Sequence, residues 1–132
     1  MLVDTSVWID FFNGHPSSAA NRLGQAIADG ESITLPGVVI TEILMGLKDD
    51  AEAVRIANLL RAFDQAAEFT SNDYEEAARL YRTCRSQGLT IRSTIDCLIA
   101  QIALRDGLPI LSKDRDFKAI AACSPLQLID LH

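Results

Sequence analysis

Short apolar segments alternate with longer helical stretches along this chain, and this alternation restricts the possible folds more than any other feature. The apolar segments predict strands at residues 1–3, 32–35, 66–70, 108–112 and 126–131. Capping residues and terminal glycines predict helices at residues 5–14, 17–30, 36–47, 49–63, 71–88, 93–107 and 114–123. Strands that alternate with helices favour a parallel sheet covered on both faces, so we predict an α/β fold with about five short, mostly parallel strands.

Length and composition favour one globular domain, and we expect residues 1–132 to fold together. Hydrophobic residues make up 48% of the chain and charged residues 23%, which excludes a disordered protein. The sequence contains no apolar run that could cross a bilayer, and we expect no secretory leader. We therefore expect a cytoplasmic protein without a membrane segment.

The cysteines and histidines argue against a disulfide framework and against zinc. Cys84, Cys97 and Cys123 are odd in number and lack the spacing of a metal or redox pair, so we expect free thiols in a reducing compartment. The histidines, His15 and His132, are too few for a zinc ligand set. The net charge of −6 argues against a protein that coats nucleic acid, although acids gathered in one pocket would distort that total.

Five acidic residues occur where a common site is possible. Asp4 follows the first predicted strand, and Asp114 and Asp116 follow the fourth. Glu42 and Asp96 lie in predicted helices that are otherwise rich in apolar residues. Because chemistry in such sheets gathers outside the carboxyl ends of the strands, these side chains could meet at one edge.

Each acid also has a purely structural explanation. Asp4 and Asp114 stand at helix N-cap positions, and Ser93 with Asp96 matches a capping box. Glu42 could point to solvent through a gap in its apolar surroundings. Taken singly, these explanations are the commoner ones, but together the acids favour one shared site.

A pocket of carboxylates would need a counter-ion. Two carboxylates about 4 Å apart repel by about 4 kcal/mol at an effective dielectric near 20, so some must bind protons or a cation. Oxygen ligands favour Mg²⁺ or Mn²⁺, and such ions support water attack on phosphodiesters. Nearby hydroxyls could orient the carboxylates or serve as ordinary helix caps. These hydroxyl residues are Thr5, Ser6 and Ser112.

Four stretches, MLVDTSVWID, VVITEILMGL, TIDCLIAQIAL and ILSKDRDF, resemble in their order and spacing the acidic motifs of PIN-domain nucleases. The length and layout resemble, more narrowly, the VapC-type toxins of prokaryotic toxin–antitoxin pairs. The resemblance implies a three-layer PIN-like sandwich and an endoribonuclease that uses Mg²⁺, or Mn²⁺ in its place, to cleave RNA, often tRNA or rRNA. It also implies a homodimer and a small VapB-type antitoxin, through which alone the toxin would be brought to DNA.

The resemblance assigns roles by position in the motifs. Asp4, Glu42, Asp96 and Asp114 match the catalytic acids, and Asp116 is an additional acid. It implies that the metal is held by the four aspartates, with Glu42 bound through a water or acting as a general base. Ser112 stands where the family often has threonine.

Two further groups of residues have both a functional and a structural interpretation. Four arginines are candidates for binding RNA phosphates, although a solvated helix surface is the commoner role of such a run. They are Arg79, Arg82, Arg85 and Arg92. Three aromatic residues could form a surface for the antitoxin or a second subunit, or could pack in the core. They are Trp8, Phe11 and Phe12.

Other classes of acidic-pocket protein fit less well. A receiver-like signalling domain would use a lysine such as Lys113, but it needs paired acids after the first strand, where only Asp4 stands. An aspartyl phosphatase needs an acid where Ser6 is found. A degenerate nuclease fold kept for binding would not be expected to retain all five acids.

Overall fold

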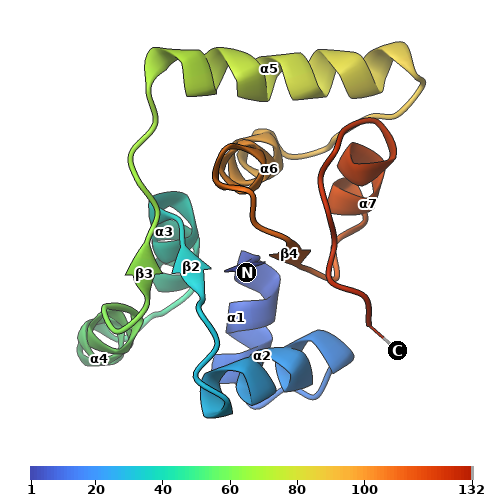
Figure 1. Cartoon of the computed structure of the whole chain (residues 1–132). Helices are drawn as coiled ribbons and strands as arrows, with labels where there is room; N and C mark the ends of the chain where they lie inside the picture. Colours follow the sequence, from blue (N-terminus) through green and yellow to red (C-terminus); the bar gives the residue numbers. More distant parts are fainter. Residues whose placement is uncertain (132) are drawn as a thin grey trace.

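Residues 1–131, which the computed structural model describes, form a short parallel sheet with helices on both sides (Figure 1). His132 lies outside the described residues. The strands are β1 (Leu2–Val3), β2 (Thr34–Leu35), β3 (Asp64–Gln65) and β4 (Ile110–Leu111). They pair in the order β3-β2-β1-β4, and every pair is parallel. Leu2 lies opposite both Thr34 and Ile110, so β1 is the centre from which the carboxyl edge is built.

Seven helices within residues 1–131 connect and cover these strands. They are α1 (Thr5–Phe12), α2 (Ser18–Ala28), α3 (Gly37–Met45), α4 (Asp50–Leu60), α5 (Ser71–Ser86), α6 (Thr94–Asp106) and α7 (Arg115–Ala122). Helices α2 and α3 pack on α1, and α4 packs on α3, whereas α5, α6 and α7 pack on one another. Figure 1 shows α5 to α7 above the strands and α1 and α2 below them, which confirms the predicted α/β sandwich.

Local capping chemistry sets the limits of the helices. At the start of α5, Thr70 and Asp73 form a reciprocal capping box, in which each side chain accepts from the other residue's backbone N–H. At the end of α6, Gly107 adopts a left-handed conformation with φ of 67°, which other residues adopt only with strain. These signals explain why the predicted and observed helices agree closely.

The strands and the flanking helices share one apolar core. The side chains of β1 and β4 are fully buried, as are Trp8 on α1 and Phe117 on α7. The Trp8 ring stacks on Phe12 with centroids 5.8 Å apart and meets the edge of Phe63 at 5.0 Å. Trp8 therefore belongs to the core, whereas Phe11 and Phe12 are half-buried at its margin.

The predicted strand at residues 66–70 is wrong. The strand β3 ends at Gln65, and the chain leaves the sheet after Ala66, whose N–H still donates to the Leu35 carbonyl at 3.2 Å. The carbonyl oxygens of Ala67 and Glu68 instead accept hydrogen bonds from the Arg105 guanidinium, at 3.0 and 3.3 Å. Because a side chain satisfies these backbone groups, the segment does not need a neighbouring strand.

The predicted strand at residues 126–131 is reduced to one bridge, between Leu128 and Ile110. The Ile110 N–H donates to the Gln127 carbonyl, and the Ile129 N–H donates to the Ile110 carbonyl, both at 2.9 Å. Because β4 is only two residues long, its outer edge has room for a single bridge. The sheet consequently has four strands rather than five within the described residues.

Helix α4 also differs from the prediction, in the residues that it buries. The amphipathic pattern of residues 49–63 predicts Val54, Ala57 and Leu60 on the buried face, but Val54 is 61% exposed. Leu60 is buried as predicted, and Ile56 is buried with it, because residues four apart lie on the same face of a helix. Val54 lies on the solvent side of this helix.

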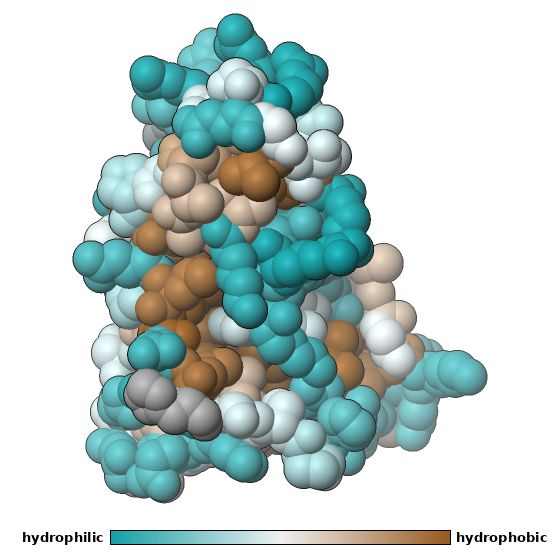
Figure 2. Space-filling model, turned by 90° about the vertical axis from the view of Figure 1, so that its right-hand side faces the viewer, coloured by the Kyte–Doolittle hydropathy of each residue, from teal (hydrophilic) through white to brown (hydrophobic). Residues whose placement is uncertain are grey.

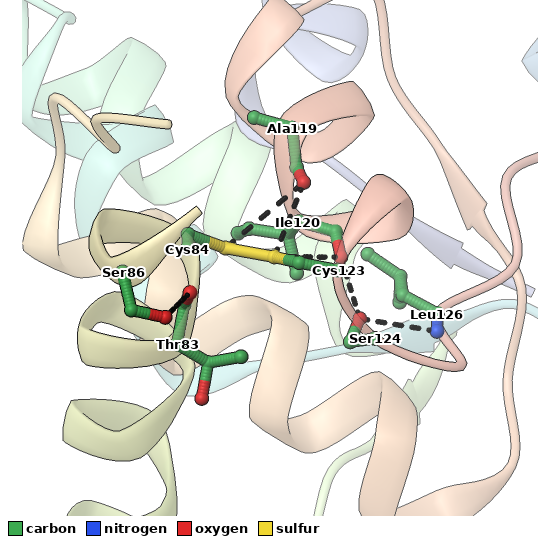
Figure 3. The surroundings of a disulfide bond; sticks show 8 residues. All are labelled: Thr83, Cys84, Ser86, Ala119, Ile120, Cys123, Ser124 and Leu126. Atoms are coloured by element: carbon green, nitrogen blue, oxygen red, sulfur yellow. Dashed lines mark hydrogen bonds between the residues drawn. A yellow bond between two sulfur atoms is a disulfide. The ribbon is translucent and has the colours of Figure 1, made fainter. Parts of the chain in front are cut away.

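The expectation of three free thiols is wrong for two of them. Figure 3 shows Cys84, near the end of α5, joined by a disulfide to Cys123, which follows α7. Their Cα atoms are 5.9 Å apart, within the usual range for a disulfide. Cys97 is free and buried, and burial raises the pKa of its thiol to about 11. The spacing of 39 residues between the bonded cysteines gave no signal of their contact.

The surface is mixed in character. On the face that looks to the right in Figure 1, apolar side chains reach the surface at mid-height, between polar areas above and below (Figure 2). Within the part of the chain that the structure describes, no helix is both long and apolar enough to cross a membrane.

Candidate active site

The carboxyl ends of β1 and β4 bring Asp4 and Ser112 together. Asp4 continues the pairing of β1, since its N–H donates to the Leu111 carbonyl at 3.0 Å. The Asp4 carboxylate also caps α1, because it accepts from the Thr5 N–H at 2.8 Å. The expected capping role and a place at the sheet edge therefore coexist in one residue.

Two hydroxyls fix the buried carboxylate of Asp4. Ser6 and Ser112 both donate to its Oδ2 atom, at 3.1 and 3.0 Å. Burial raises the pKa of Asp4, and these hydrogen bonds oppose that rise. Asp4 is thus held in one orientation at a position where its charge is costly.

Three further acids form a compact group beside Asp4, which we call the carboxylate trio. One oxygen from each carboxylate lies within 4.8 Å of the others. The trio consists of Asp96 in the first turn of α6, Asp114 at the N-cap of α7, and Asp116 in the first turn of α7. The Asp116 N–H donates to Asp114 Oδ1 at 2.9 Å, so the start of α7 sets the relative positions of these two acids.

Asp96 does not serve as a capping-box acid. Ser93 precedes α6 without a side-chain capping bond, and only its backbone carbonyl accepts from the Asp96 N–H, at 3.2 Å. The pKa of Asp96 is raised to about 8, chiefly by burial and then by hydrogen bonding with Asp116. The charges of Asp4 and Asp114 add to this rise, so Asp4 belongs to the same electrostatic group as the trio.

Glu42 lies at the margin of this group. It is half-buried on α3, and its Oε1 atom accepts a hydrogen bond from Thr5 Oγ1 at 2.6 Å. Thr5 therefore orients Glu42, whereas its backbone N–H contacts the neighbouring Asp4. Among the described residues, Glu42, like Asp4, is outside the set of carboxylates that meet within 4.8 Å.

The donor set of the trio fits a hard divalent cation. Ligand oxygens around one Mg²⁺ lie at 2.0–2.1 Å from the ion, and therefore about 3 to 4 Å from each other. The trio is only slightly wider than this, at 4.8 Å or less, and offers carboxylate oxygens alone. Pairs of charged carboxylates at such distances repel by about 3 to 4 kcal/mol at an effective dielectric near 20, which a cation would relieve.

An ion pair between an exposed lysine and a buried aspartate was missed from the sequence. Lys113, between Ser112 and Asp114, donates its ammonium to Asp10 on α1. This contact holds the pKa of Asp10 below its usual value. It also ties the β4–α7 connection to α1, and it engages the lysine that a receiver-like domain would place in its acidic pocket. No local pattern marks this pair, because its members are 103 residues apart.

The four candidate arginines do not form one stripe. Arg92 reaches the trio, with Nε 3.4 Å from Asp116 and Nη2 3.6 Å from Asp114. The other three lie on α5, where Arg79 pairs with Glu76 and Arg85 lies over the Tyr81 ring. Arg82 lines a groove of about 480 Å³ between α5 and α6, together with residues that flank Asp96.

Comparison with known proteins agrees with this architecture. Residues 1–122 match the family described as PIN domain. The chain is 34% identical to ribonuclease VapC11 of Mycobacterium tuberculosis over 128 residues, which covers 96% of both chains. It is also similar to ribonuclease VapC32 of the same species, with 30% identity over 98% of this chain and 97% of the relative.

A solved structure has the same fold at lower sequence identity. The VapBC2 complex of Rickettsia felis, bound to a DNA fragment from its promoter, contains a chain that matches with a TM-score of 0.75 and 20% identity. The match covers 99% of this chain and 98% of that one. The parallel sheet and the acids at its carboxyl edge agree with these matches. This chain therefore belongs to the PIN-domain family, in its VapC branch.

Proposed function

We propose that this chain is a metal-dependent endoribonuclease that acts as the toxin of a toxin–antitoxin pair. The carboxylate trio with Asp4 beside it is the observation that carries the proposal. The names of its relatives, which are ribonucleases, support the same activity. Residues 1–132 would act as one nuclease domain.

In this proposal the four aspartates hold Mg²⁺, for which Mn²⁺ can substitute. The cation would activate a water for attack on a phosphodiester and neutralise charge on the phosphate. Asp4 is supported by Ser6 and Ser112, and Asp114 is ordered by the start of α7. The chain thus offers rigid ligands, which is what a hard ion with strict geometry requires.

Glu42 is suited to proton transfer rather than to direct contact with the ion. It comes from α3 rather than from the end of a strand, and the Thr5 hydroxyl fixes its orientation. We assign to Glu42 the acceptance of a proton from the attacking water, for which a positioned carboxylate is adequate. A purely structural Glu42 would tolerate replacement by glutamine without loss of rate.

The substrate in this proposal is structured RNA, with tRNA and rRNA as the first candidates. Sequence-specific RNA recognition relies mostly on unstacked bases in loops and on shape, so the target is set by surfaces around the site. Arg92, which contacts the trio, has the strongest claim to meet a phosphate, and Arg82, which lines the groove between α5 and α6, is the second candidate. Arg79 and Arg85 are weaker candidates for binding phosphates, because Arg79 pairs with Glu76 and Arg85 lies over the Tyr81 ring.

A partner protein belongs to the same proposal. The solved relatives from Rickettsia felis and Haemophilus influenzae are VapBC assemblies, the first of them with promoter DNA. By analogy, this chain would form a homodimer, bind a small VapB-type antitoxin, and contact DNA only through it. A cytoplasmic location is proposed, because the RNA substrate is found there.

Cleavage of a mixture of tRNA and rRNA tests the activity. Wild-type protein should cleave with Mg²⁺ or Mn²⁺ and stop when EDTA is added. Asp4→Asn and Asp96→Asn should remain folded but lose cleavage, and Glu42→Gln should lose most of it. Asp50→Asn, which changes an exposed acid in the first turn of α4, is the matched control and should cleave normally. Cleavage that persists in excess EDTA, or in Asp96→Asn, would contradict the proposal.

A further inference from the structure

Arg92 is a positively charged residue whose guanidinium lies beside two acids of the carboxylate trio. It lies in the extended segment before α6, two residues ahead of that helix. Its Nε atom is 3.4 Å from Asp116 Oδ1, and its Nη2 atom is 3.6 Å from Asp114 Oδ1. Within residues 1–131, every ion pair recorded for these two acids is with Arg92.

These contacts occupy the oxygens that a divalent ion would need. Asp114 Oδ1 already accepts from the Asp116 N–H, and the guanidinium approaches that same atom. On Asp116, the Arg92 backbone N–H takes Oδ2 at 3.2 Å and the side chain takes Oδ1. A bound arginine and a bound metal would therefore compete for the same two carboxylates.

We propose that Arg92 is a tethered counter-ion, which holds Asp114 and Asp116 without metal, yields them to the divalent ion, and then binds the RNA phosphate. This inference rests on the proposed nuclease function. In this inference the Arg92 side chain pairs with the acids in the metal-free site and with the substrate phosphate once metal and RNA are bound.

The geometry makes the release of the side chain inexpensive. The guanidinium makes single, long contacts rather than a paired fork with one carboxylate, and the Arg92 side chain is 55% exposed. Exposed ion pairs of this kind contribute little, because solvent screens them. The release also exposes no apolar core, since the side chain already lies at the surface.

The backbone keeps the released side chain close to its target. The hydrogen bond from the Arg92 N–H to Asp116 Oδ2 does not involve the guanidinium, so it can persist after the side chain leaves. The freed guanidinium then remains beside the metal ligands, where the scissile phosphate must lie. Arginine is suited to this second role, because its planar fork can donate two hydrogen bonds to one phosphate.

Calorimetric titration with Mn²⁺ alone tests the competition without any RNA. Arg92→Ala should bind Mn²⁺ about two- to fivefold more tightly than wild type, the range that an exposed ion pair provides. Arg92→Lys should lie between them, because it keeps the charge but loses the fork. Arg61→Ala, which removes an exposed arginine at the end of α4, is the matched control and should bind as wild type does.

Thermal unfolding gives an independent check that the variant is folded and that the same competition is present. Without metal, Arg92→Ala should unfold at a lower temperature than wild type, because the acids have lost their counter-ion. Saturating Mn²⁺ should then raise its Tm by more than it raises that of wild type. With RNA and saturating Mn²⁺, Arg92→Ala should raise KM more than it lowers kcat.

The outcomes separate this inference from the proposed function. If wild type binds Mn²⁺ and Arg92→Ala binds it equally or more weakly, Arg92 orders the acids rather than competing, and the inference is overturned while the nuclease proposal stands. If Arg92→Ala left the KM for RNA unchanged, the proposed binding of the Arg92 guanidinium to the RNA phosphate would be overturned. If wild type itself fails to bind Mn²⁺, the metal-dependent function and the inference fall together.

Discussion

Ser112 and Asp4 are 108 residues apart, and one hydroxyl joins them: Ser112 Oγ donates to Asp4 Oδ2 at 3.0 Å. Ser112 Oγ also accepts a hydrogen bond from the Asp114 N–H, at 2.9 Å. A single side chain at the end of β4 therefore sets both the first acid of the chain and the start of the α7 acids. Its removal should disturb the site more than its small size suggests.

Replacement of Ser112 by alanine should weaken Mn²⁺ binding about tenfold, because groups that orient metal ligands typically contribute that much. It should also cost about 1 kcal/mol of stability through the lost hydrogen bond. Calorimetry and denaturant unfolding measure the two effects. Ser112→Thr keeps the hydroxyl and should restore Mn²⁺ binding; equal losses in both variants would show that the packing of Ser112, not its hydrogen bond, is what matters.

The metal-free protein should lose stability as the pH rises, on account of Asp96. Its pKa is raised from 3.8 to about 8 in the folded state. Between these values the folded chain keeps a proton that the unfolded chain has released, so the free energy of unfolding falls with increasing pH.

Thermal unfolding in EDTA, at several pH values between these two pKa values, measures this dependence. Asp96→Asn cannot titrate and should show a flatter profile. Mn²⁺ should restore stability at the alkaline end, because the cation replaces the proton and binds most strongly to ionised carboxylates. Parallel profiles for wild type and Asp96→Asn would show that another group is responsible.

Loss of the Lys113–Asp10 pair should destabilise the protein near neutral pH. Lys113→Ala leaves the carboxylate of Asp10, whose side chain is only 12% exposed, without its ammonium partner. Since that partner lowers the pKa of Asp10, its contribution is present above the ordinary aspartate pKa and is lost as the pH falls through the lowered one.

The measurement is Tm as a function of pH, with Lys118→Ala as the control. Lys118 is an exposed lysine on α7, and its removal should change Tm little at any pH. The deficit of Lys113→Ala should shrink in acid. A deficit of the same size at every pH would mean that the side chain contributes by packing rather than by charge.

The disulfide between Cys84 and Cys123 should stabilise the purified, oxidised protein. Closing a loop of this length contributes about 4 kcal/mol in the chain-entropy treatment. Addition of a phosphine reductant should therefore lower the Tm of wild type. A double variant, Cys84→Ala with Cys123→Ala, should be insensitive to the reductant; a wild type that is equally insensitive would show that the thiols are not paired in solution.

Much of the fold was predictable because local and periodic signals agreed. Helix limits followed from capping residues and from glycines such as Gly107, whose positive φ suits a helix end. The gathering of Asp4 with the trio followed from one topological rule, that parallel strands direct their carboxyl ends to the same edge. The weak signals were the strands, because each is only two residues long and neighbouring side chains can satisfy the backbone instead.

Contacts between distant segments could not be predicted from the sequence. The Lys113–Asp10 pair and the Cys84–Cys123 bond join residues whose local surroundings carry no sign of a partner. Arg92 was grouped with the α5 arginines by its charge, although a change of direction before α6 turns it toward the acids. Such contacts depend on how whole elements pack, which periodicity does not specify.

The acids of the site come from both sides of the mostly exposed connection at residues 46–49, between α3 and α4. Asp4 and Glu42 precede this connection, and the whole carboxylate trio follows it. Neither portion holds a complete set of ligands. If the chain were divided at this connection, neither fragment alone would be expected to cleave RNA. RNA cleavage would then indicate that the two fragments had associated.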